Sequence, residues 1–596
     1  MDKNCEKVCA WLSEVEDDYA LFDSDDTDAD SDFCIENVAS DSDESTDQTT
    51  SNVRRRSPSL SGENITIFSE PEFFLGKDKI TKWYKNNPPS NVRTRRHNIV
   101  LHLPGVKRIA RDAKSVLDCW KLFFPDTVVI DIVECTNKYL AKIRANYQNN
   151  KNVRDTTKEE IDALLGLLYL AGYLRSNHLN LHDLWRTDGF SPEYFRAVMS
   201  EKRFSLLLRA VRFDDIETRN VRRAIDKLAP IRAVFDDFVR RCKENYTVGE
   251  NCTIDEMLEG FRGRCSFRQY IPNKPNKYGI KIQALVDSRT FYTSNMEVYV
   301  GTQPDGPFKC DNSPSSIVKR LILAPISKTG RNITMDNWYN SIPLANELLK
   351  NHNLTVVGTL RKNKREIPPV FLETKKREVN STLFGYGKDL LLTSYTPNKN
   401  KNVIMISSMH DQGIIDPESG DQKKPEVITY YNGTKGGVDV VDEMKGEYSV
   451  ARISCRWPLT IFFSLMNIAG INSQIIYREN TDKMITRREY LKTLGQELTK
   501  PYMVKRLEQP CLSFLLRQQI IKMTGCTSQN NKESPNPDVS TSDQRIRCNF
   551  CPIRKNRFTK VSCSLCGVYI CKEHTTPTCP TCNTVKENSE NSNDEL

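Results

Sequence analysis

The stretch NITMDNWYNSIP, residues 332–343, carries the strand-to-helix transition on which the fold prediction depends. Its first half alternates apolar Ile333 and Met335 with polar residues, so a strand would bury one set and present the other. The Ser and Pro near its end suit the cap and the first turn of a helix. We therefore expect Asp336 at the carboxyl end of a strand, where a carboxylate is well placed for a metal. Taken alone, it is better interpreted as an ordinary turn aspartate.

Strand and helix patterns surround this stretch in a characteristic order. Three strand patterns come first, followed by a short helix, the strand just described, a second helix and a last strand: Thr253–Phe261, Gly279–Asp287, Phe291–Val300, Ser315–Leu323, Asn332–Asp336, Pro343–Lys350 and Leu354–Leu360. The close succession of the first three predicts an antiparallel meander. The whole order is that of an RNase H-like core. Helical spacing dominates on both sides of it, as in Ile161–Leu174 and Pro458–Ile476.

The 596 residues exceed what one hydrophobic core organises, so a multidomain α/β protein is expected. The predicted parts are a disordered acidic N-terminal region at 1–103, a helical domain at 104–250 and 449–525, a catalytic core at 251–361 and 426–448, an insertion at 362–425, a linker at 526–546 and a Cys-rich zinc-binding domain at 547–584. Ile161–Leu174 is too short to span a bilayer, and acids rather than apolar residues follow Met1. No membrane partner is expected.

Charge is distributed unevenly along the chain. Residues 1–50 hold seventeen acidic residues and two lysines, whereas the rest holds 84 basic and 60 acidic residues. A basic folded part favours a polyanionic partner, with nucleic acid as the first candidate, although Lys-rich surfaces also simply aid solubility. The arginine run at 54–56 is interpreted either as a nuclear import signal or as a solvated charge cluster. Nuclear localisation is the expectation.

Seven of the nineteen cysteines lie between Cys548 and Cys582, and with one histidine they form four pairs of metal-ligand spacing. The eight expected ligands are Cys548, Cys551, Cys563, Cys566, Cys571, His574, Cys579 and Cys582. Eight such ligands suit two structural, tetrahedral Zn²⁺ sites. The spacing alone leaves the connectivity open between a cross-brace and a sequential arrangement. It also permits a RING-like ubiquitin ligase, which would leave the carboxylates unexplained.

Three further acids lie where the predicted core can bring them to Asp336. Asp255 is in the first strand beside Glu256, and only one of that pair can face a common site. Asp439 and Asp442 are three residues apart on a predicted helix and share one face, although acids near a helix start also simply complement its dipole. Carboxylates converging from two strands and a helix can hold two Mg²⁺ or Mn²⁺ ions for phosphoryl transfer.

The chain resembles the piggyBac transposase family, in its insect-type form, over most of the length after the acidic region. The motifs that carry the resemblance occur in order: TIDE at 253–256, GFRGR at 260–264, PNKP at 272–275, KYGIK at 277–281, DNW at 336–338, SIPLA at 341–345, NKREIP at 363–368, YN at 431–432, TKGGVD at 434–439 and RWP at 456–458. So many ordered matches exclude a chance similarity.

The resemblance implies a cut-and-paste DNA transposase. Asp255, Asp336 and Asp439 match the catalytic triad of the family, and Asp442 matches a further essential aspartate. Enzymes of this family nick each transposon end with water, form hairpin ends and join the element at TTAA sites. The resemblance also implies a homodimer on double-stranded DNA, a helical domain for dimerisation and DNA binding, and a cross-brace zinc module that binds transposon ends. The cross-brace would pair Cys548 and Cys551 with Cys571 and His574.

Nine polar or aromatic residues gain an expected role in DNA binding from this context: Lys274, Lys277, Asn337, Arg361, Lys364, Arg365, Lys435, Arg456 and Trp457. Arg361, Lys364 and Arg365 follow a strand and can hold target phosphates. Arg456 can bind phosphate, and Trp457 can stack on an unpaired base. For each one taken singly, a surface salt bridge or a core Trp is an equal alternative.

The main alternative function is a domesticated DNA-binding or chromatin protein that keeps the fold and no longer uses the chemistry. The intact aspartates at 255, 336 and 439 favour the enzyme. The basic motifs do not discriminate, because both kinds of protein bind DNA.

Overall fold

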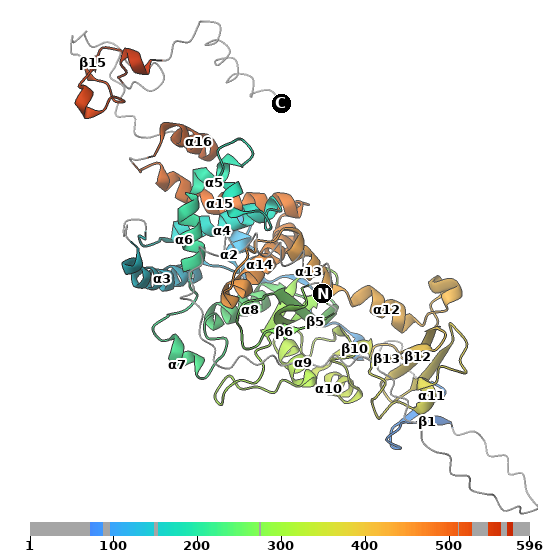
Figure 1. Cartoon of the computed structure of the whole chain (residues 1–596). Coiled ribbons are helices and arrows are strands. Elements are labelled where there is room, and N and C mark those ends of the chain that lie inside the picture. The colour runs from blue at the N-terminus through green and yellow to red at the C-terminus, as the bar shows by residue number, and fades with distance from the viewer. Residues whose placement is uncertain are drawn as a thin grey trace, which may run out of the picture. The chain divides into compact units, whose positions relative to one another are not determined.

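A computed structural model describes residues 72–87, 96–147, 153–272, 274, 276–509, 512–526, 546–561 and 569–575 of the chain. Met1–Gly525 forms one unit and Cys526–Leu596 forms another (Figure 1). The first unit contains a large mixed sheet with helices on both faces, and the second contains the cysteine-rich segment.

The sheet of the first unit has eleven described strands. Its order is β1-β2-β11-β12-β13-β10-β9-β5-β7-β6, and β8 pairs with β7. The central strands are β5 Asn251–Gly260, β6 Gln269–Tyr270, β7 Tyr278–Asp287, β8 Thr293–Val298, β9 Asn332–Met335 and β10 Thr355–Thr359. β5, β7 and β8 are antiparallel, whereas β9 lies parallel to both β5 and β10. The predicted meander and the following strand, helix and strand are confirmed.

The predicted insertion continues this sheet instead of forming a separate layer. Its strands are β11 Thr382–Tyr386, β12 Leu391–Asn398 and β13 Lys401–Ser407, and β13 pairs antiparallel with β10. Beyond them, β1 Phe73–Leu75 and β2 Lys82–Tyr84 complete the edge through Tyr84 opposite Tyr386. The prediction of disorder throughout 1–103 is therefore wrong for residues 72–87. It is also wrong for residues 96–103, which contain a 3-10 turn at Arg96–Asn98 and a bond from Leu101 N to the Thr329 carbonyl at 3.1 Å. The segment 72–87 contains several apolar residues, and its Trp83 is 2% exposed.

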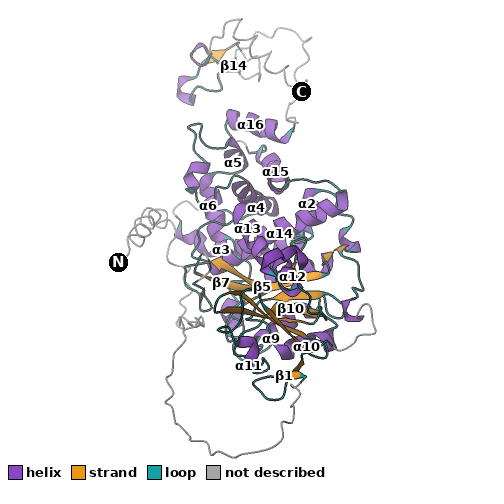
Figure 2. Ribbon diagram, turned by 90° about the vertical axis from the view of Figure 1, so that its right-hand side faces the viewer, coloured by secondary structure: helices purple, strands orange, loops and turns teal. Residues whose placement is uncertain are grey.

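Helices cover both faces of the sheet. α9 Pro314–Leu323 and α10 Ile342–His352 lie on one side, and α12 Glu426–Thr434, α13 Gly437–Glu447 and α14 Trp457–Thr481 lie on the other (Figure 2). α11 Pro369–Leu372 is a single turn against β12. The remaining helices of this unit are α2 Val116–Lys121, α3 Asp126–Ile143, α4 Lys158–Tyr173, α5 Glu193–Val198, α6 Glu201–Ala210, α7 Arg219–Arg223, α8 Arg232–Asn245, α15 Arg487–Arg506 and α16 Phe514–Thr524.

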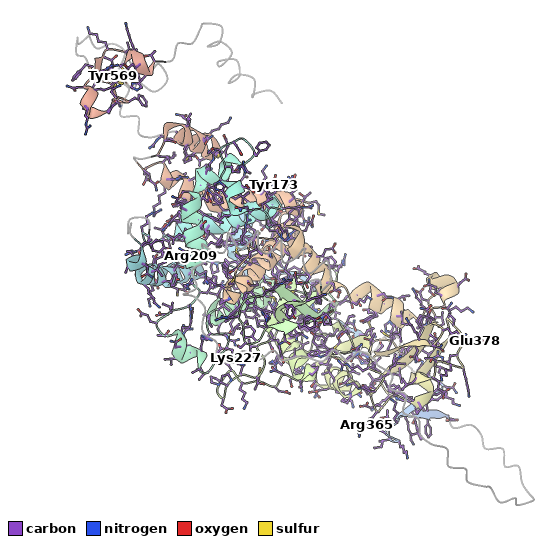
Figure 3. All side chains as sticks on the ribbon, viewed as in Figure 1. Tyr173, Arg209, Lys227, Arg365, Glu378 and Tyr569 are labelled. Carbon is purple, nitrogen blue, oxygen red and sulfur yellow. The ribbon has the colours of Figure 1, made fainter. Side chains whose placement is uncertain are left out.

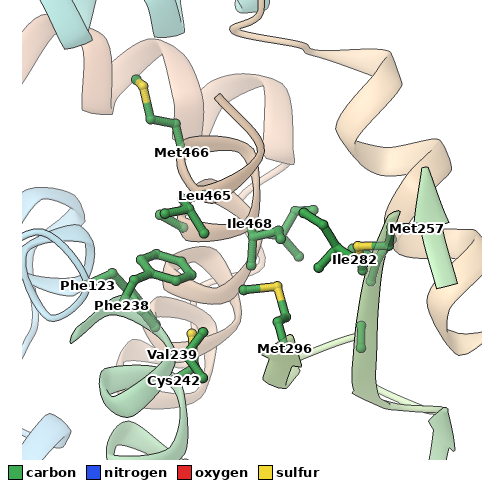
Figure 4. Packing of buried hydrophobic residues seen from close by; sticks show 14 of the residues in the cluster. Phe123, Phe238, Val239, Cys242, Met257, Ile282, Met296, Leu465, Met466 and Ile468 are labelled. Carbon is green, nitrogen blue, oxygen red and sulfur yellow. The ribbon is translucent and has the colours of Figure 1, made fainter. Parts of the chain in front are cut away.

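Helix α14 joins the helical layer to the sheet in one hydrophobic core. Its Leu465 and Ile468 lie between Phe123 and Phe238 of the helical layer and the sheet residues Met257 and Ile282 (Figure 4). α14 is the one described helix long and apolar enough to cross a membrane, and 89% of its most apolar window is buried. Its hydropathy therefore reflects burial within this core.

Two helices that are far apart in the sequence meet at a pair of glycines. A β-carbon on Gly166 of α4 would lie 2.9 Å from the carbonyl oxygen of Gly495 on α15. A β-carbon on Gly495 would lie 3.0 Å from the carbonyl oxygen of Gly166. Because neither position has room for a side chain, α4 and α15 pack with their backbones in close approach. Residues from both predicted helical segments thus form one helical layer.

The described part of the second unit is small. β14 Ile546–Arg547 pairs antiparallel with β15 Phe558–Thr559, and a short 3-10 turn at Lys572–His574 follows. Cys548, Cys551 and Cys571 form its buried centre.

A buried carboxylate ties the helical layer together. Glu160 of α4 is 0% exposed and accepts from Arg203 Nε at 3.0 Å and Nη2 at 2.6 Å. Arg154 Nη2 and the Tyr502 hydroxyl each donate to it at 2.7 Å. Burial alone raises the pKa of Glu160, but Arg203 and Arg154 outweigh it and hold this pKa below the usual 4.5. A lowered pKa stabilises the fold above about pH 4.5, and this contribution is lost as the pH falls through the folded value.

We predict that Glu160→Gln lowers the free energy of unfolding by about 3 kcal/mol at pH 7, because it leaves buried Arg203 without a counter-charge. Urea unfolding of the full chain, followed by tryptophan fluorescence, measures the loss. Glu159→Gln is the matched control, because its partly exposed ion pair with Lys505 contributes at most about 1 kcal/mol. Equal losses in the two variants, or an unchanged difference between them at pH 3, would contradict this account.

Candidate active site and metal centre

Strands β5 and β9 bring two of the predicted aspartates together. They pair in parallel with Thr253 opposite Thr334 and Ile254 opposite Met335. Asp255 and Asp336 are the next residues in this register, and neighbouring strands lie about 4.8 Å apart. Because side chains alternate along a strand, each aspartate projects to the same face as the threonine two residues before it. The carboxylates are thus neighbours at one end of the sheet.

The C-terminal end of α12 contacts the two threonines that precede these aspartates on the same face of the sheet. The Thr253 hydroxyl donates to the Thr434 carbonyl at 2.6 Å, and the hydroxyls of Thr334 and Thr434 are 2.7 Å apart. Gly437, the first residue of α13, lies against Thr253, where a β-carbon would be 2.6 Å from the threonine hydroxyl. α13 therefore begins beside the two strands, and its Asp439 lies near their ends.

Asp336 starts the turn that leads into α10. Its Oδ1 accepts from the backbone N–H of Trp338 at 2.9 Å and of Tyr339 at 3.4 Å. Burial raises the pKa of Asp336, and the charge of Glu256 raises it further, against the opposing backbone N–H groups and Lys281. One carboxylate oxygen thus orders the turn.

The pKa of Asp255 lies well above the usual value for an aspartate. Burial raises its pKa to about 8, with further contributions from the charges of Glu256 and Asp336. The Glu256 backbone N–H, 2.8 Å from Asp255 Oδ1, and the charge of Lys274 oppose the shift only in part. Burial and the neighbouring acids therefore together disfavour the charged form of Asp255.

Lys274 connects the third aspartate to this group. Its ammonium lies 3.6 Å from Asp439 Oδ1 and donates to the Glu256 carbonyl at 3.1 Å. The Asp439 side chain is 65% exposed. Lys274 was predicted as a DNA contact, and the structure places it among the carboxylates instead of on an open surface.

Asp442 has a different environment from Asp439. It pairs with Lys445 at 2.8 Å, and Lys445 is 5% exposed and also pairs with Glu259 of β5. The Ser464 hydroxyl of α14 donates to the same Glu259 at 2.7 Å. This buried group ties α13 to β5 and α14. The predicted metal-binding role of Asp442 stays a prediction, since its carboxylate already serves this contact.

Tyr431 of α12 faces the same acids, and neither composition nor spacing indicated it. Burial raises its pKa to about 12, and the charges of Asp336, Asp255 and Asp439 add to the shift, against a hydrogen bond with Thr359. A phenol that responds to all three carboxylates must lie near each of them. Glu256, Glu259 and Lys445 were also missed as members of the site, because their roles depend on tertiary contacts.

The donor set is a fit for hard divalent cations. It offers carboxylate oxygens from two strands and one helix, and two of them, Asp255 and Asp336, are half-buried side chains whose pKa is raised mainly by burial. Within the described ranges, Cys548, Cys551, Cys571 and His574 are the one metal-ligand group whose donor atoms all lie within 4.8 Å of one another. The aspartates are thus gathered in an open arrangement, with Lys274 beside Asp439.

Most of the predicted DNA contacts lie at the surface. Lys277, Asn337, Arg365 and Lys435 are exposed, and Arg361 and Lys364 are half-buried. Arg365 lies in the loop that follows β10 (Figure 3). Lys435 lies over the ring of Tyr431 at 5.6 Å, close to the carboxylates.

The predictions for Arg456 and Trp457 need correction. Trp457 is 9% exposed and packs edge-on against Phe267, with ring centroids 5.0 Å apart. It is a core residue at the first position of α14, and base stacking requires an exposed ring. Arg456 donates to the carbonyls of Arg209 at 2.9 Å and Val211 at 2.6 Å. Its guanidinium is thus used to hold α6 against α14.

Four of the eight predicted zinc ligands form a cluster in the second unit. His574 Nδ1 lies 3.5 Å from Cys548 Sγ, 3.7 Å from Cys551 Sγ and 3.3 Å from Cys571 Sγ. Three thiols and one imidazole at these separations fit one tetrahedral Zn²⁺. The first and third pairs meet, as the cross-brace requires and the sequential arrangement forbids. Cys563, Cys566, Cys579 and Cys582 lie outside the described residues.

The chain is similar to several known proteins. A family model described as Transposase IS4 matches residues 115–474. Human piggyBac transposable element-derived protein 3 is 24% identical over 365 residues, which cover 58% of this chain and 59% of that protein. Human piggyBac transposable element-derived protein 5 is 21% identical over 410 residues, covering 66% and 77%. A cryo-EM structure of a piggyBac transposase synaptic complex with hairpin DNA matches with a TM-score of 0.70 and 38% identity, covering 81% of this chain and 100% of that one.

These matches differ in extent. The chain spans about three fifths of the length of the first human relative and the whole length of the transposase in the DNA complex. The residues matched by the family model include β5, β9 and α13, which carry the aspartates.

We predict that Gly437→Ala lowers the free energy of unfolding by about 1–3 kcal/mol, because its β-carbon would overlap the Thr253 side chain and push α13 away from β5. Gly446→Ala is the control in the same helix. No atom lies within 4 Å of its β-carbon, so stability should stay the same or rise by up to about 1 kcal/mol. Denaturant unfolding measures both variants, and equal effects would show that α13 does not depend on this close approach.

We predict that Cys571→Ser lowers the zinc content of the purified full chain by about one equivalent, because it removes one of four ligands from a tetrahedral site. Elemental analysis after dialysis measures the metal. Cys310→Ser, which removes an exposed thiol outside the cluster, should leave the content unchanged. A Cys571→Ser protein with full zinc content would contradict the assignment.

Proposed function

This chain belongs to the piggyBac family of transposases, and from that premise we propose that it is a cut-and-paste DNA transposase. It excises an element through hairpin ends and joins it at TTAA sites, in an RNase H-like core. The observation that carries the proposal is the parallel register of β5 and β9, which sets Asp255 beside Asp336 at the point where α13 brings Asp439. Asp442 is proposed as a fourth essential carboxylate.

Asp255, Asp336 and Asp439 are the residues that would hold divalent metal, with two Mg²⁺ or Mn²⁺ ions proposed per site. When bound, such ions supply Lewis-acid activation of the attacking oxygen and charge stabilisation at the leaving oxygen. The environment of Asp255 supports this assignment, because burial and the charges of Glu256 and Asp336 raise its pKa to about 8 and a bound cation would favour the ionised carboxylate.

The chain's own residues set the geometry of the reaction. In the first step a water oxygen bonds to the phosphorus, the bond from phosphorus to the 3′ oxygen breaks, and that oxygen leaves as a 3′-hydroxyl with the proton that the water gives up. The oxygen of this 3′-hydroxyl then bonds to a phosphorus of the opposite strand. The bond from that phosphorus to its own 3′ oxygen breaks, and this oxygen leaves with the proton of the attacking hydroxyl, which closes the hairpin. Asp336 is fixed by the turn that it caps, and Lys274 lies beside Asp439, where its ammonium can bind a phosphate as well as the carboxylate.

DNA binding is proposed for three surfaces and supported by the matched structure of a transposase with hairpin DNA. The loop at 361–365, the exposed Lys277, Asn337 and Lys435, and the cysteine-rich unit supply the contacts. For the last, we propose two structural Zn²⁺ ions in a cross-brace and binding to transposon ends. A homodimer that synapses two ends in the nucleus completes the proposal.

A domesticated DNA-binding protein is the second candidate. It is favoured by the human relatives, whose names describe them as derived from transposable elements. The complete set of aspartates in this chain favours the enzyme.

We predict that the purified chain with Mg²⁺ excises a marker flanked by TTAA and cognate terminal repeats from a plasmid, and that Asp336→Asn lowers the excision rate by about 100-fold or more. Asparagine keeps an oxygen to accept from the Trp338 N–H, so the turn should persist while the charge is lost. Asp305→Asn is the control at an exposed aspartate. Wild-type protein that performs no better than Asp336→Asn would favour the domesticated protein.

A further inference from the structure

Residues 72–87 and 361–367 form one structural element, although Trp83 and Glu366, which join them, are 283 positions apart in the sequence. We call the first segment the N-terminal hairpin, after its strands β1 and β2, and the second the basic loop, which follows β10. Trp83 of β2 is 2% exposed, and its indole N–H donates to the Glu366 carbonyl at 2.9 Å. In Figure 1 the blue β1 lies beside α11, the turn that follows the basic loop.

Backbone contacts fix the basic loop against the hairpin. Lys77 N donates to the Ile367 carbonyl at 3.3 Å, and Asp78 N donates to the Arg365 carbonyl at 3.0 Å. The Lys77 ammonium donates to the Lys362 carbonyl at 2.7 Å. Together with Trp83, the hairpin thus satisfies carbonyls of four of the seven loop residues. A β-carbon on Gly76 would lie 2.8 Å from the Glu366 oxygen, so the two backbones touch.

The joined element is strongly basic. Its two segments hold eight basic side chains and three acidic ones: Lys77, Lys79, Lys82, Lys85, Arg361, Lys362, Lys364 and Arg365 against Glu72, Asp78 and Glu366. Asp78 is used internally, because it accepts from the Ile80 and Thr81 N–H groups and from the Thr81 hydroxyl. Lys79 and Lys82 are exposed. The surface of the element therefore presents mainly cations.

The basic loop leaves the sheet at the end where the carboxylates lie. β10 pairs in parallel with β9, with Gly358 opposite Met335, so Thr359 follows at the level of Asp336. Arg361 comes only two residues later. A polyanion bound at the carboxylates thus has the basic loop as its neighbour, and the hairpin contacts that loop.

We propose that the N-terminal hairpin is part of a composite surface for the phosphate backbone of duplex DNA, in which it holds the basic loop in place and adds Lys79 and Lys82 as phosphate contacts. The proposal rests on the proposed function, in that the duplex is the one being cut or joined. Such contacts position DNA without reading its sequence. The ordinary alternative is that lysines on an edge strand only prevent unwanted strand pairing.

The test compares two variants of the full chain with equal changes in charge. Lys79→Gln/Lys82→Gln removes two hairpin lysines, and Lys399→Gln/Lys401→Gln removes two exposed lysines around the β12–β13 turn of the same sheet. Affinity for a TTAA duplex and for a scrambled duplex is measured over a range of salt concentrations. We expect the hairpin variant to lose roughly tenfold in affinity on both duplexes and to lower the salt slope by about 2, one for each phosphate contact. The control variant should bind like wild type.

Trp83→Phe tests the holding role separately. It keeps an aromatic ring in the core but removes the donor to the Glu366 carbonyl. We expect weaker DNA binding and faster proteolysis within residues 361–367, with an unfolding midpoint within a few degrees of wild type. Unchanged binding and unchanged proteolysis would overturn the holding role.

Three outcomes of the lysine comparison would overturn the phosphate contacts. Equal losses in both variants would mean that only net charge matters, and no loss in the hairpin variant would leave the edge-protection alternative. Higher affinity in the hairpin variant would mean that these lysines bind the chain's own acidic residues 1–50. Each is distinct from failure of the proposed function, which shows as wild-type excision no better than Asp336→Asn.

Discussion

The parallel register of β5 with β9 is the constraint on which the candidate active site depends. It places Asp255 and Asp336 at the same level of the sheet. It also pairs Thr253 with Thr334, two residues earlier in each strand, and both threonines bond to Thr434. That anchor ends α12 beside the strands, so α13 starts there and supplies Asp439. A slip of one residue would send one aspartate to the opposite face of the sheet. The apolar side chains of β9 and of its two neighbouring strands resist such a slip, because it would remove them from their buried positions.

Gathering these acids is unfavourable in itself, and the surrounding cations show how the fold offsets it. Lys445 is almost fully buried between Glu259 and Asp442, and it fastens α13 to β5 at some distance from the reacting end. Lys274 does the corresponding work at Asp439, but on an exposed carboxylate that a metal or a phosphate can reach. Spacing alone placed Asp439 and Asp442 on one helix face, and their two lysine partners show that these aspartates have different environments. Asp442 is held by the interior, whereas Asp439 is left accessible.

Sequence periodicity predicted the central strands and helices closely, because each is governed by local alternation. The strand Asn332–Met335 and the helix Ile342–His352 are examples. It could not derive that Asp255 neighbours Asp336, since register is set by contacts between distant residues, and the family resemblance supplied that link. The role of Trp457 was misjudged for the same reason. From the sequence, an aromatic residue beside an arginine suits base stacking as well as a core position, and only its contact with Phe267 shows that it belongs to the core. Spacing did predict the first and third metal-ligand pairs, and folding joined them.

Sequence analysis missed the N-terminal hairpin because the hairpin is stabilised by contacts with residues far away in the sequence. Three-residue strands have little intrinsic preference for order, and β1 and β2 exist here because Trp83 is buried against residues 366–387 and the hairpin bonds to the basic loop. The dependence runs both ways. The basic loop follows β10, which pairs with β9, and Asp336 directly follows β9, so one continuous ladder links the hairpin to the carboxylates. The sheet therefore already orders the loop on which a phosphate backbone would lie. DNA binding would not incur the conformational-entropy cost of ordering that loop.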